Sequence, residues 1–134
     1  MGNPEGSFIE IAEKSVFWLK FTVTGEQTHA SLPQKGNNAL AAGMRFAVEL
    51  EDTLKATFNE VDEIYDPPYS TFEPTQRWGN VASPNVVPGK DEFCFDMRVL
   101  PQINLDDVVK KVEEVAAKFR QSRNVCLLYT SRCV

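Results

Sequence analysis

The chain has 134 residues, enough for one domain built around a single hydrophobic core. Apolar residues make up 43% of the sequence and charged residues 25%, which is the composition of an ordinary globular domain. The formal net charge of −5 argues against a nucleic-acid-binding surface, and no apolar run is long enough to span a bilayer.

The cysteines and the N-terminal segment favour a cytoplasmic location. Cys94, Cys126 and Cys133 are widely spaced and odd in number, so they predict neither a disulfide framework nor a zinc site. Cys94 lies within an apolar run, and we expect it to be an inert, buried thiol. Residues 1–15 lack the basic and apolar segments of a signal peptide.

The first half of the chain predicts a strand followed by a helix. Residues 16–24 alternate between two faces, which predicts a strand with one buried face formed by Phe17, Leu19, Phe21 and Val23. Residues 39–54 carry a helical apolar stripe made of Ala39, Gly43, Phe46, Leu50 and Leu54. Asn37 or Asn38 can cap this helix, and the small residues at positions 41–43 would allow close approach by a neighbouring backbone.

The middle of the chain predicts two strands of different quality. Residues 66–89 contain five prolines, so a strand at about 70–82 is expected to be irregular or to lie at a sheet edge. Residues 90–99 alternate clearly. One face of this strand carries Phe93, Phe95, Met97 and Val99, and the opposite face carries Cys94, Asp96 and Arg98.

The last part predicts a second helix and a further strand. Asn104 can cap a helix over residues 104–119, whose first turn carries Asp106 and Asp107. Its expected apolar stripe is Leu105, Val108, Val112, Val115 and Phe119. Residues 125–130 can form a last strand. The resulting β-α-β-β-α-β order predicts an α+β, ferredoxin-like sandwich, with an antiparallel sheet, two helices on one face, and Asp96 and Arg98 on the open face.

Several kinds of catalytic site find little support in the sequence. Zinc needs three or four converging ligands, and this chain has a single histidine and no paired cysteines. We interpret Glu113 and Glu114 as helix-surface residues that pair with lysines such as Lys110 and Lys118. Ser31 lies close to His29 but outside any nucleophile-elbow motif, and no glycine-rich phosphate loop is present.

Three polar residues remain as candidates for binding an anion. They are His29 after the first strand, Asn85 in a turn-rich stretch, and Arg98 on the strand over residues 90–99. Histidine and asparagine donate hydrogen bonds, and the arginine fork matches a carboxylate. Spacing alone does not establish this site, because Arg98 could instead pair with Asp96 or another acid.

Two motifs resemble one known family. The stretches GEQTHASLPQKGNNAL (25–40) and SPNVVPGKDEFCFDMRVLP (83–101) are similar to the dimerisation (lid) domain of a zinc-dependent family. That family includes acetylornithine deacetylase, succinyl-diaminopimelate desuccinylase, aminoacylases and glutamate-type carboxypeptidases. The resemblance covers residues 7–121 and is strongest to members that act on acyl-diaminopimelate.

The resemblance implies roles for the three candidates. His29 would reach into the active site of a partner subunit and hold the carbonyl oxygen of the scissile amide. Asn85 and Arg98 would bind the substrate carboxylate. Two zinc or cobalt ions would sit in a separate catalytic domain, so this chain would hold no metal and would be inactive alone. The expected partners are a second copy of the chain and a carboxylate-bearing substrate, with no nucleic acid or membrane.

The chain also departs from the family pattern. The metal-ligand motif and the catalytic glutamates of the family are absent, so we expect a fragment of a longer enzyme. We divide it into a connecting segment (1–15), the lid domain (16–121) and a tail (122–134) that is a last strand or foreign sequence. The alternatives are a free-standing ferredoxin-like module that binds small molecules and an RNA-recognition domain. The negative charge argues against the latter.

Overall fold

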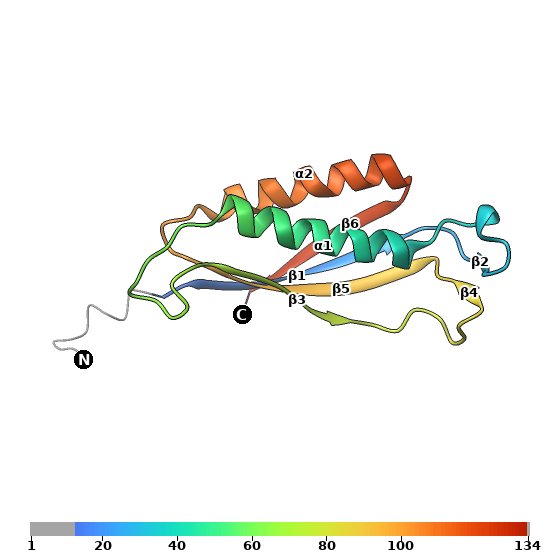
Figure 1. Ribbon diagram of the computed structural model, residues 1–134, viewed down its shortest axis with the longest axis horizontal. Coiled ribbons are helices and arrows are strands. Elements are labelled where there is room, and N and C mark those ends of the chain that lie inside the picture. Colours follow the sequence, from blue (N-terminus) through green and yellow to red (C-terminus); the bar gives the residue numbers. More distant parts are fainter. Residues whose placement is uncertain (1–12, 134) are drawn as a thin grey trace.

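A computed structural model describes residues 13–133 of the chain. Four antiparallel strands form one sheet in the order β3-β5-β1-β6: β1 (Ser15–Thr24), β3 (Thr71–Arg77), β5 (Lys90–Val99) and β6 (Cys126–Cys133). Two helices, α1 (Ala39–Thr57) and α2 (Leu105–Arg123), cover one face of this sheet (Figure 1). This arrangement confirms the predicted ferredoxin-like α+β sandwich.

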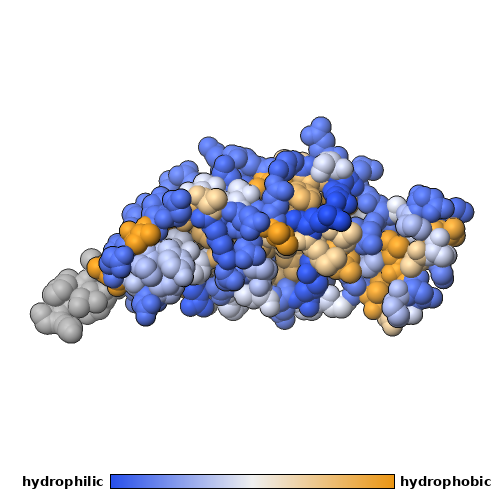
Figure 2. All heavy atoms as spheres, viewed as in Figure 1, coloured by the Kyte–Doolittle hydropathy of each residue, from blue (hydrophilic) through white to orange (hydrophobic). Residues whose placement is uncertain are grey.

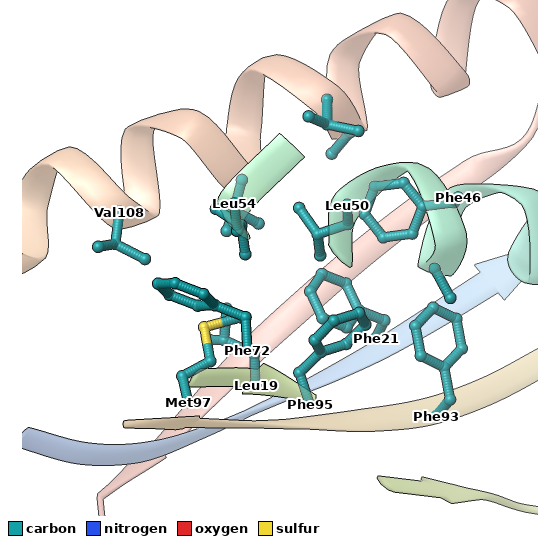
Figure 3. Packing of buried hydrophobic residues seen from close by; sticks show 14 of the residues in the cluster. Leu19, Phe21, Phe46, Leu50, Leu54, Phe72, Phe93, Phe95, Met97 and Val108 are labelled. Atoms are coloured by element: carbon teal, nitrogen blue, oxygen red, sulfur yellow. The ribbon is translucent and has the colours of Figure 1, made fainter. Parts of the chain in front are cut away.

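The sheet is organised around the central pair β1 and β5. Their register runs without a break from Ser15 opposite Val99 to Thr24 opposite Lys90. On β1, the predicted face of Phe17, Leu19, Phe21 and Val23 is buried. They belong to one core cluster with Phe93, Phe95 and Met97 of β5. Figure 3 shows Leu19 and Phe21 beside these β5 residues beneath the helices. Alternating apolar residues on both central strands therefore build the sheet side of the core.

Both helices present the apolar stripe that their sequence predicts, with one exception. On α1, Phe46, Leu50 and Leu54 are fully buried against the sheet. On α2, the buried positions are Val108, Val112, Val115, Ala116 and Phe119. The prediction is wrong at Leu105, which is 39% exposed. Leu105 is the first residue of α2, and the buried residues of this helix begin at Val108.

The neighbouring residues Asn37 and Asn38 make different hydrogen bonds at the helix ends. Asn38 caps α1, because its side chain accepts a hydrogen bond of 3.0 Å from the Ala41 amide. Asn37 instead donates from Nδ2 to the carbonyls of Arg123 and Asn124, at the C-terminal end of α2. Asn104 caps α2 as predicted, with a bond of 2.8 Å from the Asp106 amide.

The strand bounds differ from expectation where proline intervenes. β3 is an edge strand with an irregular register between Pro74 and Gln76, as the prolines predict, but it ends at Arg77. At the other edge, β6 pairs with β1 and extends the predicted last strand to Cys133. The division of the chain into connecting segment, lid domain and tail stays a prediction, and most of the connecting segment lies outside the described residues.

Candidate functional site

The candidate residues His29 and Asn85 lie on a projection that extends beyond one end of the sheet. This arm (residues 25–37 and 79–89) contains two short strands, β2 (Thr28–His29) and β4 (Val86–Val87), and the 3₁₀ helix η2 (Pro33–Lys35). Figure 1 shows the arm past the starting end of β5. On the face drawn in Figure 2, hydrophobic residues form small scattered patches, one of them at the arm.

Backbone hydrogen bonds hold the two halves of the arm together and attach the arm to the start of α1. The Gly25 amide donates to the Gly89 carbonyl at 2.8 Å, and Glu26 and Asn37 exchange two bonds of 2.8 Å. A Cβ on Gly25 would lie 2.2 Å from the Asn37 carbonyl oxygen, so this close approach requires glycine. The Ala39 amide, at the start of α1, donates to the Pro88 carbonyl at 2.9 Å. The two halves of the arm are therefore joined to each other, and the arm is joined to the start of α1.

The exposed imidazole of His29 has a defined orientation. Its Nδ1 accepts a hydrogen bond of 3.2 Å from the Ser31 amide and lies 2.7 Å from Ser31 Oγ. Because Nδ1 accepts from the backbone, the proton of the neutral ring is assigned to Nε2. His29 thus offers Nε2–H as a donor on the outside of the arm.

The contact between Ser31 and His29 also resembles the first half of a nucleophile–base pair. Here it joins residues two apart in an exposed turn. Within residues 13–133, no carboxylate is hydrogen-bonded to the second ring nitrogen, as a catalytic triad would require. The geometry is that of a local turn that orients the ring.

Asn85 lies beside His29, directly before the neighbouring strand β4. The Asn85 carbonyl accepts from the Ala30 amide at 2.8 Å, and His29 is paired with Val86. The side-chain oxygen of Asn85 accepts from Ser83 Oγ at 2.6 Å, which leaves its NH₂ group to donate. The structure therefore brings His29 and Asn85 together as two adjacent, exposed donors.

Arg98 lies near the far end of β5, on the open face of the sheet. It donates to Asp96 from Nε at 2.9 Å and from Nη2 at 3.3 Å, so the pairing that the sequence left open is present. The hydrogen bond from Arg98 lowers the pKa of Asp96, with a further contribution from the Trp18 indole, while partial burial opposes the shift. The same pair raises the pKa of Arg98.

Arg98 is well separated from the other two candidates. The register places Lys90, next to the arm, opposite Thr24, whereas Arg98 lies opposite Val16 at the other end of β1. Eight residues of extended strand correspond to about 26 Å. One copy of the chain therefore brings His29 and Asn85 together and keeps Arg98 away from them.

A second group of polar residues, at the root of the arm, was missed in the sequence analysis. Asp91 is fully buried and accepts two hydrogen bonds of 2.9 Å from Nε and Nη2 of Arg77. A Cβ on Gly43 would lie 1.9 Å from Asp91 Oδ2, so the small residue in α1 makes room for this carboxylate rather than for a neighbouring backbone. The alternation along β5 could have predicted the burial of Asp91, because Asp91 is in phase with the buried residues Phe93 and Phe95.

Cys94, Glu113 and Glu114 differ in detail from what the sequence predicts. Cys94 is only partly buried, because it lies on the open face of the sheet. Glu113 and Glu114 are helix-surface residues as predicted, but the partner of Glu113 is Arg120 and that of Glu114 is Lys111. Lys118 pairs with Glu49 of α1 instead. Both glutamates therefore pair with basic residues of their own helix, whereas Lys118 is taken by the neighbouring helix α1.

Neither a metal centre nor a membrane segment is present in the described part of the chain. Residues 13–133 contain no group of three or more His, Cys, Asp or Glu side chains that could hold a metal ion. Within the same range, no helix combines the length and apolar character that crossing a bilayer demands.

Comparisons with known proteins found a matching family and several relatives of this chain. The family model described as peptidase dimerisation domain matches residues 11–122. An uncharacterized metallohydrolase of Methanocaldococcus jannaschii is 41% identical over 118 residues, which are 88% of this chain and 29% of that protein. A succinyl-diaminopimelate desuccinylase of Halorhodospira halophila is 26% identical over 94 residues, covering 70% of this chain and 24% of its own.

A solved structure shows the same fold. The hydantoinase/carbamoylase family amidase of Burkholderia ambifaria superimposes with a TM-score of 0.74 at 20% identity, over 96% of this chain and 32% of that chain. The present chain thus spans less than a third of the length of these proteins. The motifs, the fold and the family match agree, and the chain belongs to the peptidase dimerisation domain family.

Proposed function

We propose that this chain is the dimerisation and substrate-binding lid of a metal-dependent amidohydrolase that acts on N-acyl amino acids or related amides. The family match and the relatives named metallohydrolase and desuccinylase support this reaction class. Because the chain spans less than a third of those relatives, the bond-breaking groups are assigned to another domain. We expect the full protein to be cytoplasmic and the isolated chain to be inactive.

The metal ions of this enzyme are also assigned to the other domain. The described residues do not fit a metal site, since they include one histidine and no cluster of three ligating side chains. We therefore assign no residue of this chain to the two zinc or cobalt ions. The contribution of the lid is to bind and orient the substrate.

His29 is proposed to stabilise the carbonyl oxygen of the scissile amide. Its Nε2–H is free of protein partners among the described residues, and its ring is held by Ser31. A donor placed where negative charge develops acts mainly on the rate, and its loss costs about 10²–10³ in turnover. Asn85, adjacent on the arm, donates from its side-chain amide to the substrate carboxylate.

The observation that carries the proposal is the separation of Arg98 from the arm. One copy cannot place all three residues around one small substrate, because about 26 Å of strand lies between them. Two copies related by a two-fold axis can do so, with His29 and Asn85 from one copy and Arg98 from the other. Dimerisation would then complete the substrate site.

A subunit-mixing experiment in the full-length protein tests this arrangement. His29→Ala and Arg98→Ala are each expected to lower activity strongly. In a mixed dimer of the two variants, one site has an intact Arg98 from one subunit and an intact arm from the other. After random exchange, activity should recover to about a quarter of the wild-type value, since half of the dimers are mixed and each has one intact site.

The chain offers a matched control for this experiment. His29 and Asn85 lie on the same arm, so mixing His29→Ala with Asn85→Ala leaves every site with one damaged donor. That mixture should stay inactive although its subunits exchange. If the His29 and Arg98 variants fail to complement each other, the proposed two-copy site is wrong.

A further inference from the structure

A small hollow lies on the open face of the sheet and has no role in the function proposed above. Its lining residues come from three strands and the loop after β3: Trp18, Lys20, Gln76, Trp78 and Cys94. The hollow has a volume of about 160 Å³. Both tryptophans of the 134-residue chain line it, and they are 43% and 36% exposed. Such a pair of exposed indoles on one face is a feature of binding surfaces.

Each tryptophan is oriented by a polar contact. The Trp18 indole N–H donates to Asp96 Oδ2 at 2.9 Å. The Lys20 ammonium lies 4.8 Å from the centroid of the Trp78 ring, and the Trp78 amide donates to the Glu92 carbonyl at 3.1 Å. Both rings are therefore positioned while part of their surface stays accessible.

The hollow also lies close to Arg98. Arg98, Asp96 and Cys94 alternate along the open face of β5, so the hollow begins next to the residue that binds the Arg98 guanidinium. Asp96 accepts from Nε and Nη2, and among the described residues the Nη1 group of Arg98 makes no hydrogen bond. Nη1 can therefore donate to a second acceptor.

The charges near the hollow are paired, and Arg98 keeps one donor for an anion. Lys20 and Lys90 both pair with Glu92, at 3.4 and 3.8 Å, and Arg98 pairs with Asp96. Glu73 of β3 lies opposite Asp96 in the register and pairs with Lys55. A carboxylate here would therefore be bound through Nη1 of Arg98, and not by a local excess of positive charge.

The size of the hollow limits what it can take. Ligand pockets for whole drug-sized molecules measure about 300–1,000 Å³, well above this hollow. A cavity of about 150 Å³ accommodates a benzene ring. The hollow therefore suits one planar ring of a ligand whose remaining atoms extend along the sheet.

We propose that the hollow between Trp18 and Trp78 binds the aromatic acyl group of a ligand whose carboxylate is held by Arg98. The ligand class is an aromatic N-acyl amino acid, with the ring and the carboxylate joined by a short amide linkage. This inference rests on the proposed function in one respect, the assignment of Arg98 to a carboxylate. The hollow would then select among acyl groups.

The two indole N–H signals in the proton–nitrogen NMR spectrum of this chain provide the test, because both report on the hollow. We expect N-benzoyl-glutamate to shift both signals and to bind about tenfold more tightly than N-acetyl-glutamate, which carries the same carboxylates without the ring. Tenfold corresponds to about 1.4 kcal/mol, within reach of aromatic stacking and burial.

Two variants separate the hollow from the carboxylate site. Trp78→Leu should abolish the tenfold preference and leave the binding of N-acetyl-glutamate unchanged. Arg98→Gln should weaken both ligands and leave their ratio unchanged. Tyr69→Leu is the matched control, since Tyr69 is an aromatic residue that is 50% exposed and lies outside the hollow.

The outcomes distinguish the two assignments. If both ligands bind equally well and only Arg98→Gln weakens them, the inference about the hollow is wrong and the carboxylate assignment stands. If the preference depends on Trp78 but Arg98→Gln changes neither affinity, the hollow stands and the carboxylate assignment fails. If neither indole signal shifts with either ligand up to its solubility limit, the hollow is not a binding site.

Discussion

Asp91 and Arg77 form an ion pair where β5 adjoins the arm. The carboxylate is completely buried, whereas the Arg77 side chain is 36% exposed and stacks over Phe93 at 5.0 Å. The two partners therefore lose different amounts of hydration on folding. A buried carboxylate without a partner is much more costly than a half-exposed guanidinium without one.

We predict that the two halves of this pair differ in their contribution to stability. Arg77→Met leaves Asp91 buried and unpaired and should lower the free energy of unfolding by about 2–4 kcal/mol, allowing for the partial exposure of Arg77. Asp91→Asn keeps an acceptor for Arg77 and should cost about 1–2 kcal/mol. Urea unfolding of both variants measures the difference. Equal losses, or a harmless Arg77→Met, would contradict the prediction.

At the scale of elements, β6 is connected to α2 by a polar cluster as well as by backbone pairing to β1. Tyr129 on β6 donates to Glu113 of α2 at 2.7 Å, and Arg120 donates to the same carboxylate at 2.6 Å. The hydrogen bond from Arg120, followed by that from Tyr129, lowers the pKa of Glu113. Desolvation, followed by the hydrogen bond to Glu113, raises the pKa of Tyr129 to about 12.

This raised pKa predicts a stability change at high pH. A phenol of the unfolded chain titrates near about 10, so Tyr129 stabilises the folded state below that pH. The contribution is lost as the pH rises from about 10 through the folded pKa of about 12. The fall in unfolding free energy over this range should therefore be smaller in Tyr129→Phe than in the wild type.

Spectrophotometric titration checks the same prediction directly. The difference between the ultraviolet titration curves of the wild type and Tyr129→Phe isolates this one phenol from the other tyrosines. We expect the midpoint, and hence the pKa of Tyr129, at about 12. A midpoint of about 10 would show that Tyr129 is neither desolvated nor hydrogen-bonded to Glu113 in solution.

At the scale of the whole molecule, the outer face of α1 is the strongest candidate for contact between copies. Met44 and Val48 are one helical turn apart and are 46% and 59% exposed. They line a shallow depression together with Arg45, Glu49 and Asp52. Apolar residues with a rim of both charges are typical of self-complementary contacts.

We predict that the chain forms a dimer at high micromolar concentration through this face. Val48→Glu should shift the equilibrium toward the monomer, because the contact would bury a charge on both copies. Val109→Glu is the control, since Val109 is an exposed valine on α2. Sedimentation velocity over a range of concentrations is the measurement. If the two variants behave alike, α1 does not form the dimer contact.

Local sequence patterns were sufficient to predict the two helices, the four strands of the sheet and the family. The alternation in β1 and β5 and the apolar stripe of α1 depend on neighbours two to four residues apart, and every predicted position in them is buried. The family resemblance likewise depends on short stretches of sequence, those around His29 and Asn85. The exact ends of the elements and the short elements β2, β4 and η2 needed the structure, because they depend on what they pack against.

The sequence by itself therefore determined the β-α-β-β-α-β order, the core-facing residues of the central strands, and the three candidate residues. Only the tertiary structure decided how those candidates are arranged, placing His29 beside Asn85 and Arg98 at the opposite end of β5. It also decided that Asp91 pairs with Arg77 and that both tryptophans line one hollow. The physical reason is that strand register and ion pairing join residues far apart in the chain, and no local periodicity records which of them will meet.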